Sequence, residues 1–244
     1  MHRFFVDKSS FTNDEVLLNK KQVHQIRHVL RMKEGEHIIV LDNTGFEYEV
    51  ELSVVGKDKT VGSIVEKRRA PGEPLARLTL YQSLMTRDKF EFVLQKCTEV
   101  GVSRFVPVVT ERSIVRDTAI KEGKLHRWRS IIMEAAEQSG RGLIPELRVP
   151  IEYRQAIVET EEYDMSLIGC TKRGKELHGS LALVKADGHV SLFIGPEGGF
   201  TDEELESCLE EGAMPVTLGR RILRTETAGV VASALVLYEL GEME

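Results

Sequence analysis

The sequence has few cysteines and no long apolar run, and both shortages narrow the possible classes of protein. Cys97, Cys170 and Cys208 are an odd number and lie far apart, so a disulfide framework and a paired Cys-x-x-Cys metal site are excluded. We expect three reduced, half-buried thiols and no bound metal. No stretch approaches the ~20 apolar residues that cross a membrane. The first residues, MHRFFVDKSS, lack the pattern of a secretory signal, so we expect a cytoplasmic protein with no membrane partner.

The sequence also lacks both common phosphate-binding motifs. Neither GxGxxG nor the Lys-Ser/Thr of a P-loop occurs, which disfavours a nucleotide-dependent α/β enzyme. The sequence also has no excess of basic residues, since its net charge is -6. Nucleic-acid-binding proteins typically have basic surfaces, so the net charge argues mildly against a nucleic-acid partner. Residues 1–72 nevertheless carry 12 Lys and Arg against 11 Asp and Glu, with four of the seven histidines. Any polyanion contact is therefore expected in this N-terminal part.

A cluster of turn formers over residues 67–74, KRRAPGEP, marks a domain boundary. We predict one domain over residues 1–72 and a second over 73–244. The first domain has short alternating patterns that predict strands at 3–6, 36–42, 46–54 and 60–66, and one helical segment at 20–31. In the second, predicted strands (78–83, 104–109, 163–168, 189–194, 214–218) alternate with predicted helices (88–100, 121–141, 177–185, 202–211, 226–240). This alternation predicts an α/β fold with a parallel sheet covered on both faces.

Two glycine-bearing loops follow predicted strands, where open α/β sheets bind ligands. The first is FIGPEGGFT at 193–201, and Thr201 with Glu204 forms a capping box for the next helix. The acidic residues at 202–204 would repel a phosphate at that helix end, so a neutral or cationic ligand is expected. The second is LGRRILRTETA at 218–228, in which Thr225 is expected to cap the last helix. That helix is apolar on nearly every side over 228–235, which predicts burial from several directions and a subunit interface.

The motifs GPEGGFTDEE and LGRRILRTETA, in this order near the C-terminus, resemble the RsmE family of 16S ribosomal RNA (uracil-N3)-methyltransferases in the SPOUT superfamily. The resemblance extends to LQKCTEVGV at 94–102, ERS at 111–113, EAAEQSGR at 134–141 and HQIRHVLRMKEGE at 24–36, and so covers the whole chain. It implies a small PUA-like β-barrel domain before a SPOUT-type parallel sheet with a C-terminal trefoil knot. It also implies a homodimer that methylates 16S ribosomal RNA in the small ribosomal subunit.

The resemblance implies S-adenosylmethionine as the cofactor, held by three loops. Their residues are Leu167, Ile168, Gly169, Ile194, Gly195, Pro196, Glu197, Gly198, Gly199, Leu218, Gly219, Ile222, Leu223 and Ala228. Backbone groups and apolar side chains of such loops suit an adenine ring, and the cationic sulfonium suits a site without phosphate motifs.

Methyl transfer to uridine N3 needs alignment of the reacting atoms and loss of the N3 proton. Arg224 is our candidate for stabilising the resulting anion. Glu226 is a candidate base, although a carboxylate in a first helical turn commonly only complements the helix dipole.

The candidate RNA contacts are Arg3, His24, Arg27, His28, Arg31, Arg112, Glu134, Gln138 and Arg141. The histidines and arginines of 24–31 share one helical stripe that suits phosphates. Glu134, Gln138 and Arg141 fall at i, i+4 and i+7, so they suit a polar wall beside the base or an ordinary solvated face. A SPOUT enzyme of other specificity, such as ribose 2'-O methylation, and a non-catalytic RNA-binding protein remain open.

Overall fold

The computed structural model describes residues 1–57, 59–171 and 174–243, so residue 244, the end of the expected second domain, lies outside the described residues. The chain forms two compact units. The first comprises residues 1–73 and 136–144, and the second comprises 74–135 and 145–244. Among the described residues, no helix is long and apolar enough to cross a membrane.

The first unit is built on a six-stranded sheet with the order β1-β4-β5-β6-β3-β2. Its strands are β1 (Arg3–Phe5), β2 (Phe11–Thr12), β3 (Glu15–Leu18), β4 (His37–Leu41), β5 (Phe46–Val55) and β6 (Thr60–Arg69). β1 pairs with β4 in parallel, whereas the other pairs are antiparallel. Alternate apolar residues of these strands face one core, because successive side chains of a strand point to opposite faces. The four strands expected from the sequence are confirmed, and β2 and β3 were missed.

The expected helix of residues 20–31 is present but irregular. Helix α1 (Lys20–His24) begins after Asn19, whose side chain accepts a hydrogen bond from the backbone N–H of Gln22. It continues as a π-helical segment (Gln25–Leu30) that ends at Arg31 in the left-handed region, with φ 57°. Val23 and Ile26 are buried in the core of the unit. The apolar spacing therefore predicted the buried face correctly, whereas the wider turn has no signature in the sequence.

The second unit contains a parallel sheet with the order β10-β8-β7-β13-β11-β14-β12, and β9 pairs with β8 off this path. Its strands are β7 (Arg77–Ser83), β8 (Arg104–Val109), β9 (Glu146–Leu147), β10 (Ile151–Glu152), β11 (Met165–Gly169), β12 (Lys175–Glu176), β13 (His189–Ile194) and β14 (Met214–Thr217). Every pair is parallel. The predicted parallel sheet is thus confirmed, and the carboxyl ends of β11, β13 and β14 lie side by side.

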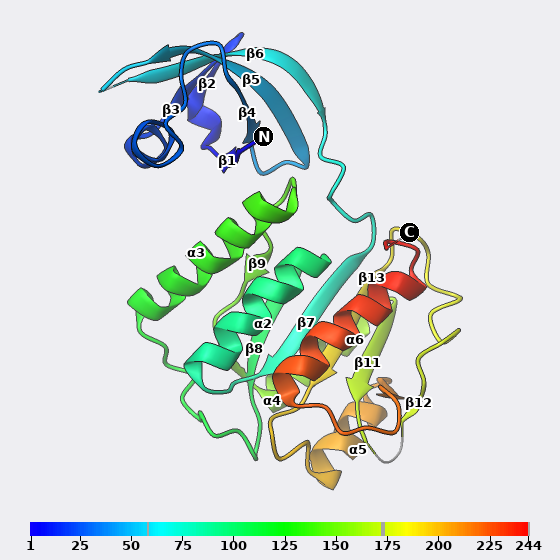
Figure 1. Ribbon diagram of the computed structural model, residues 1–244. Helices are drawn as coiled ribbons and strands as arrows, with labels where there is room; N and C mark the ends of the chain where they lie inside the picture. Colours follow the sequence, from blue (N-terminus) through cyan, green and yellow to red (C-terminus); the bar gives the residue numbers. More distant parts are fainter. Residues whose placement is uncertain (58, 172–173, 244) are drawn as a thin grey trace. The chain divides into compact units, whose positions relative to one another are not determined.

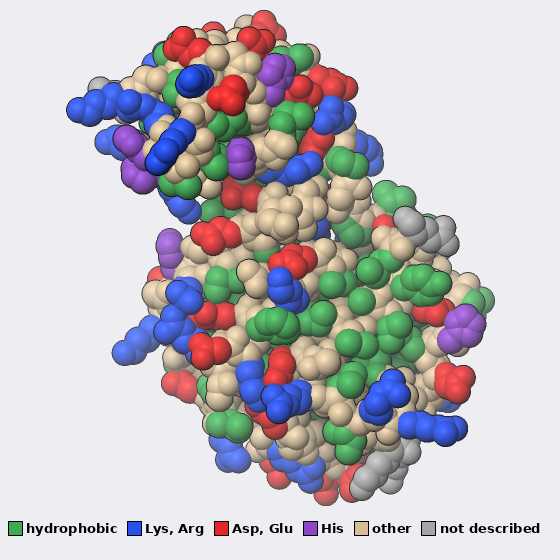
Figure 2. Space-filling model, viewed as in Figure 1, with side chains coloured by type: hydrophobic (Ala, Val, Ile, Leu, Met, Phe, Trp, Pro, Cys, Tyr) green, Lys and Arg blue, Asp and Glu red, His purple; other side chains and the backbone are tan. Residues whose placement is uncertain are grey.

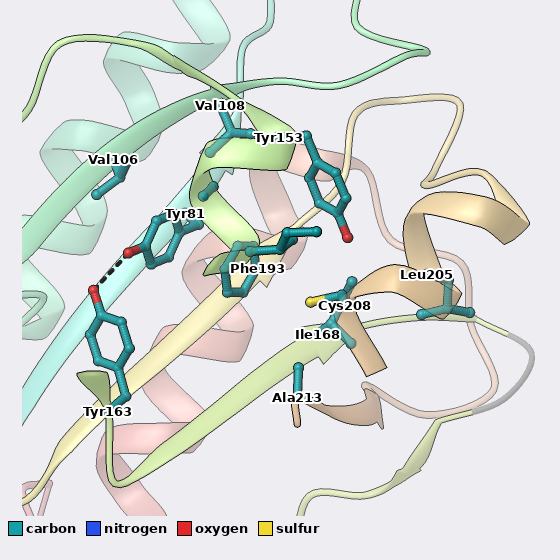
Figure 3. Packing of buried hydrophobic residues seen from close by; sticks show 12 residues of the cluster. Tyr81, Val106, Val108, Tyr153, Tyr163, Ile168, Phe193, Leu205, Cys208 and Ala213 are labelled. Carbon is teal, nitrogen blue, oxygen red and sulfur yellow. Dashed lines mark hydrogen bonds between the residues drawn. The ribbon is translucent and has the colours of Figure 1, made fainter. Parts of the chain in front are cut away.

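Helices cover both faces of this sheet (Figure 1). They are α2 (Arg87–Val100), α3 (Glu122–Ser139), α4 (Tyr153–Val158), α5 (Asp202–Glu210) and α6 (Thr225–Glu239). α2 packs against α6, and α6 lies on β7 and β13. On the other face, α4 and α5 pack on a core in which Tyr81 and Phe193 stack with ring centroids 4.3 Å apart (Figure 3). Alternate residues of β7 thus point to the two helical layers.

Three local expectations need correction. The helix predicted at 177–185 is instead a series of turns, because Gly179 at φ +71° interrupts helical geometry. Helix α4 was missed, since its six residues are too few to show a helical period. Of the thiols, Cys97 and Cys208 are fully buried rather than half-buried, and only Cys170 is intermediate; all three are free.

Candidate functional site

A cavity of about 780 Å³ lies at the carboxyl ends of β11, β13 and β14. It is built from three loops, one after each strand, and this is the edge at which open α/β sheets bind ligands. The lining residues are Arg112, 169–171, 194–202, Leu205, 216–225 and Ala228. The sheet order thus joins segments that are about fifty residues apart in the chain into one pocket.

The first glycine loop, residues 194–200, is held at its C-terminal end. Thr201 caps α5 by accepting a hydrogen bond from the N–H of Glu204, whose carboxylate accepts one from the N–H of Thr201, so the predicted capping box is confirmed. The other Glu204 oxygen accepts a hydrogen bond from the N–H of Glu111 at 2.8 Å. From the same segment, Arg112 donates to the carbonyl of Gly198 at 3.0 Å and to that of Phe200 at 3.3 Å. The ERS motif therefore supports the loop.

A charged cluster lies beside this loop. The Nζ of Lys89, on α2, donates to Oε1 of Glu197 at 3.0 Å and lies 3.7 Å from Oε2 of Glu226 on α6. The hydrogen bond to Glu197 raises the pKa of Lys89 above its usual value. Lys89 does not line the cavity, although it contacts the loop that does.

The second glycine loop gives the cavity a basic side. Arg220, Arg221 and Arg224 are exposed and line the cavity, as does Arg112 from the other side. Four guanidinium groups around one opening attract a polyanion, despite the net charge of -6. In the sequence, Arg220 and Arg221 stood out only as part of a motif, so their position at the cavity was not predicted.

The residues present fit the expected cofactor. The volume lies within the ~300 to 1,000 Å³ that small-molecule sites usually have. Leu218 and Leu223 supply apolar surface, and the glycines leave backbone groups accessible. The lining also includes Asp202, in the acidic first turn of α5, which disfavours a phosphate at that end of the helix.

Most of the residues predicted to bind the cofactor gather around this cavity. Those that line it are Gly169, Ile194, Gly195, Pro196, Glu197, Gly198, Gly199, Leu218, Gly219, Ile222, Leu223 and Ala228. Leu167 and Ile168 do not, because both side chains are fully buried and Ile168 belongs to the hydrophobic core. The loop after β11 instead contributes Cys170 and Thr171. The prediction placed this contribution two residues too early in the chain.

The two candidate catalytic residues differ in position. Arg224 lines the cavity, whereas Glu226 does not and lies near the ammonium of Lys89. The expected cap of α6 is wrong: Arg224 occupies the capping position, and Thr225 donates its hydroxyl to the carbonyl of Gly195 at 2.5 Å. Thr225 also accepts a hydrogen bond from Gln82. Thr225 thus links the two glycine loops.

The candidate RNA contacts are spread over both units. In the first unit, His24, His28 and Arg31 are exposed and Arg27 is half-buried, and the two imidazole rings lie 4.9 Å apart. The two histidines therefore lie together, whereas a stripe that also includes Arg27 and Arg31 stays a prediction, because residues 25–30 are π-helical and Arg31 lies beyond them. Arg3 is 28% exposed and its Nε lies 4.0 Å from the buried carboxylate of Glu47.

The predicted polar face of residues 134–141 is only partly present. Glu134 and Gln138 are exposed on α3. Arg141 is 1% exposed, and its guanidinium donates two hydrogen bonds to Glu73, at 2.7 and 3.1 Å. Arg141 lies beyond the last residue of α3, so the helical spacing used for the prediction does not apply to it. We withdraw Arg141 from the RNA contacts. No cluster of three or more metal-ligating side chains occurs among residues 1–57, 59–171 and 174–243.

Two family models match the sequence. An RNA methyltransferase domain matches residues 71–237, and an RNA methyltransferase PUA domain matches residues 18–65. The chain is 32% identical to Ribosomal RNA small subunit methyltransferase E of Bacillus subtilis (strain 168), covering 98% of this chain and 97% of the relative. It is 30% identical to the protein of the same name from Aquifex aeolicus (strain VF5), covering 97% and 99%.

Solved structures give the same result. A Ribosomal RNA small subunit methyltransferase E from Neisseria gonorrhoeae, crystallised with S-adenosyl methionine, has a TM-score of 0.86 at 33% identity over 98% of this chain and 97% of that one. A methyltransferase from Legionella pneumophila in complex with the bound cofactor SAM has a TM-score of 0.83 at 31% identity over 97% and 96%. The expected fold class, a PUA-like domain before a SPOUT-type α/β domain, is confirmed. The trefoil knot stays a prediction.

Proposed function

Because the chain belongs to the family of ribosomal RNA small subunit methyltransferases E, we propose that it transfers the methyl group of S-adenosylmethionine to N3 of a uridine in 16S ribosomal RNA. This proposal depends on one observation, that the two glycine loops and the loop after β11 line a common cavity. Its size and the apolar surface of Leu218 and Leu223 fit the cofactor. The N3 position follows from the family resemblance of the motifs.

The cofactor supplies an electrophilic methyl group on a positively charged sulfur, and the protein positions the acceptor. The loops 194–200 and 218–224 would hold the cofactor through backbone groups and through Leu218 and Leu223. Arg224, exposed on the cavity wall, would stabilise the negative charge that uridine acquires when N3 loses its proton. Glu226 lies 3.7 Å from the ammonium of Lys89, which favours an ion pair for this carboxylate over a role as the base that removes the N3 proton.

The RNA substrate would bind to two groups of basic side chains. The stripe of His24, Arg27, His28 and Arg31 would contact phosphates from the first unit, in which the PUA model matches. Arg112, Arg220 and Arg221 would contact the phosphates that flank the target uridine at the cavity. Glu134 and Gln138, and Arg3, remain further candidate contacts. Ribosomal RNA as substrate implies the cytoplasm as the location.

The protein would act as a homodimer that pairs through α6. This helix is apolar on most sides, and Leu235 and Tyr238 are 39% and 60% exposed. Figure 2 shows hydrophobic side chains gathered over α6. Light scattering should report two copies for the unmodified chain and one copy for Leu235→Glu. Val158→Glu, at an equally apolar exposed site on α4, should remain a dimer. A monomeric unmodified chain would refute the dimer.

Mass spectrometry of ribosomal RNA from cells with and without the gene tests the reaction. We expect one N3-methyluridine of 16S RNA to disappear and to return with the unmodified gene. Ala228→Phe, which fills the cavity, should not restore it, whereas Ala182→Phe at an exposed site should. Loss of a ribose-methylated nucleotide instead would establish the alternative specificity. An unchanged set of methylated nucleotides would support the non-catalytic alternative.

A further inference from the structure

Two residues outside the cavity contact both halves of its wall. Gln82 lies near the end of β7 and Lys89 lies in the first turn of α2, so the two residues flank the short connection between these elements. Neither lines the cavity. Each nevertheless reaches the first glycine loop and the beginning of α6, directly or through one intermediate. None of the sequence motifs pointed to either residue as part of a site.

Gln82 makes the inner connection. Its side chain is 1% exposed, and its Nε2 donates to the hydroxyl of Thr225 at 3.1 Å. Thr225, 5% exposed, donates in turn to the carbonyl of Gly195 at 2.5 Å. This buried relay runs from β7 through the first residue of α6 to the loop after β13. The amide thereby orients the hydroxyl, because an oxygen that accepts from Gln82 keeps its proton for Gly195.

Lys89 makes the outer connection between the same two elements. Its ammonium donates to Glu197 in the loop and lies 3.7 Å from the carboxylate of Glu226 in α6. A single cation between two carboxylates holds together groups that would otherwise repel each other.

The packing of α6 preserves the inner relay. A Cβ on Gly229 would lie 2.5 Å from Oε1 of Gln82, so only glycine lets α6 approach the amide this closely. That Oε1 atom is buried and has no hydrogen-bond partner in the described part of the chain. A buried acceptor without a partner costs stability, and an apolar side chain would avoid this cost. The contact that the amide provides at this position is therefore its bond to Thr225, whereas its Oε1 atom lowers stability.

We propose that Gln82 and Lys89 are positioning residues for cofactor binding, which hold loop 194–200 against the start of α6 and so fix the shape of the cavity. This inference rests on the proposed function, since S-adenosylmethionine is taken as the ligand. Neither residue touches the cofactor or the reacting atoms. Their effect passes through Thr225 and Gly195 on one side and through Glu197 on the other.

Calorimetric titration with S-adenosylmethionine tests the inner relay. Gln82→Met keeps the volume but removes the donor, and we expect the Kd to rise about fivefold, the typical effect of one buried hydrogen bond. Thr225→Val should have an effect of at least this size, and Thr225→Ser, which keeps the hydroxyl, should restore most of the affinity. The double variant Gln82→Met, Thr225→Val should lose less than the product of the single losses, because both changes break one chain of bonds.

Gly229→Ala perturbs Gln82 without changing it and should also raise the Kd. The matched control is Thr160→Val, because Thr160 is 4% exposed and donates to the carbonyl of Glu211 at 2.7 Å, outside the cavity. It should lower the melting temperature without changing the Kd. Gln22→Met in the first unit is the matched control for the buried amide.

Lys89→Met tests the outer connection without threatening the fold, because Lys89 is 34% exposed. We expect the Kd to rise about twofold at low salt and the difference to shrink at high salt, since exposed ion pairs are screened. Lys89→Arg should keep the affinity.

Two results would overturn the proposal. One is a folded Gln82→Met protein with an unchanged Kd, and the other is an equal loss of affinity in Thr160→Val. If the unmodified protein itself bound no S-adenosylmethionine, the proposed function would fail instead. Failure of the proposed function is measured on the unmodified chain, whereas failure of the positioning role is measured on its variants, so the two failures are distinguishable.

Discussion

Several side chains of this protein have roles that depend on neighbours far away in the sequence. Thr225 looks like an ordinary helix cap, yet it bonds to Gly195, thirty residues upstream. Arg112 looks like an exposed basic residue, yet it holds the carbonyls of Gly198 and Phe200. In both cases the residue type indicated a hydrogen-bonding group correctly. The partner was decided by the order of the strands.

Arg224 offers the most direct test of catalysis at this scale. Arg224→Ala should abolish methyl transfer, because no other side chain at the start of α6 would carry the positive charge for the uridine anion. The Kd for S-adenosylmethionine should change less than about twofold. Rates and titrations measure the two effects separately, with Arg154→Ala on α4 as the exposed control. Full activity of Arg224→Ala would remove this residue from the catalytic group.

His189 should make the stability of the protein sensitive to acid. Burial, with Arg77 and Arg104 nearby, lowers its pKa from 6.5 to about 4, although Asp164 opposes this shift. Above pH 6.5 the imidazole is neutral in both states and contributes nothing. As the pH falls from 6.5 towards 4, the unfolded chain takes up a proton that the folded chain refuses, so the free energy of unfolding decreases. Below about 4 the loss is complete.

The expected loss at pH 5 is about 1 kcal/mol, after allowance for partial exposure of the ring. Urea unfolding at pH 7 and pH 5 measures it. His189→Gln should remove this part of the pH dependence, whereas His126→Gln, on the exposed side of α3, should leave it unchanged. An identical pH dependence in the unmodified chain and His189→Gln would contradict the assignment.

At the scale of elements, the segment 136–144 is the clearest departure from a simple division of the chain. It belongs to the first unit although it follows residues of the second. Within the first unit, Glu73 accepts hydrogen bonds from Arg141 and from the N–H groups of Gly142 and Leu143. Asn43 accepts one from the N–H of Ile144. One carboxylate thus accepts hydrogen bonds from three consecutive residues of this segment.

Glu73→Gln should therefore be strongly destabilising. It replaces the carboxylate that bonds the 1% exposed guanidinium of Arg141 with a neutral amide, and breaking a buried pair typically costs ~3 kcal/mol or more. Glu146→Gln makes the same chemical change in the exposed pair with Arg104 and should cost less than ~1 kcal/mol. Denaturant unfolding compares the two. Equal losses would show that the Glu73 pair contributes no more than a surface ion pair.

At the scale of the whole molecule, charge is distributed unevenly. Residues 1–72 have 12 basic and 11 acidic side chains, whereas residues 73–244 have 21 and 28. The second unit compensates locally, because four arginines line the cavity of an otherwise acidic region. A negatively charged RNA is therefore expected to be attracted at the histidine and arginine stripe of the first unit and at the cavity opening.

The salt dependence of RNA binding tests the stripe. Replacing Arg27 and Arg31 with alanine should reduce the slope of log K against log salt by about two, one for each lost phosphate contact. Binding of a 16S RNA fragment between about 50 and 200 mM salt measures the slope. Replacing the exposed Lys57 and Lys59 removes the same charge from the same unit and should change the slope less. Equal slopes for both double variants would count against a specific stripe.

The sequence by itself determined the longer strands and helices and the chemistry of the loops. Alternating apolar residues defined the strands, since burial of one face leaves a period of two, and the glycine loops marked the carboxyl ends of the strands that carry the site. The capping box at Thr201 was readable because its two partners are three residues apart. Family motifs supplied the cofactor.

Only the tertiary structure decided which of these groups meet. It buried Arg141 against Glu73 and kept Leu167 and Ile168 in the core. It also brought Gln82, Lys89 and Arg112 to partners that are 143, 108 and 86 residues away. Local periodicity reports whether a side chain is buried, but its partner depends on the order of strands in the sheet. That order is fixed by packing across the whole unit, and it has no signature in a short stretch of sequence.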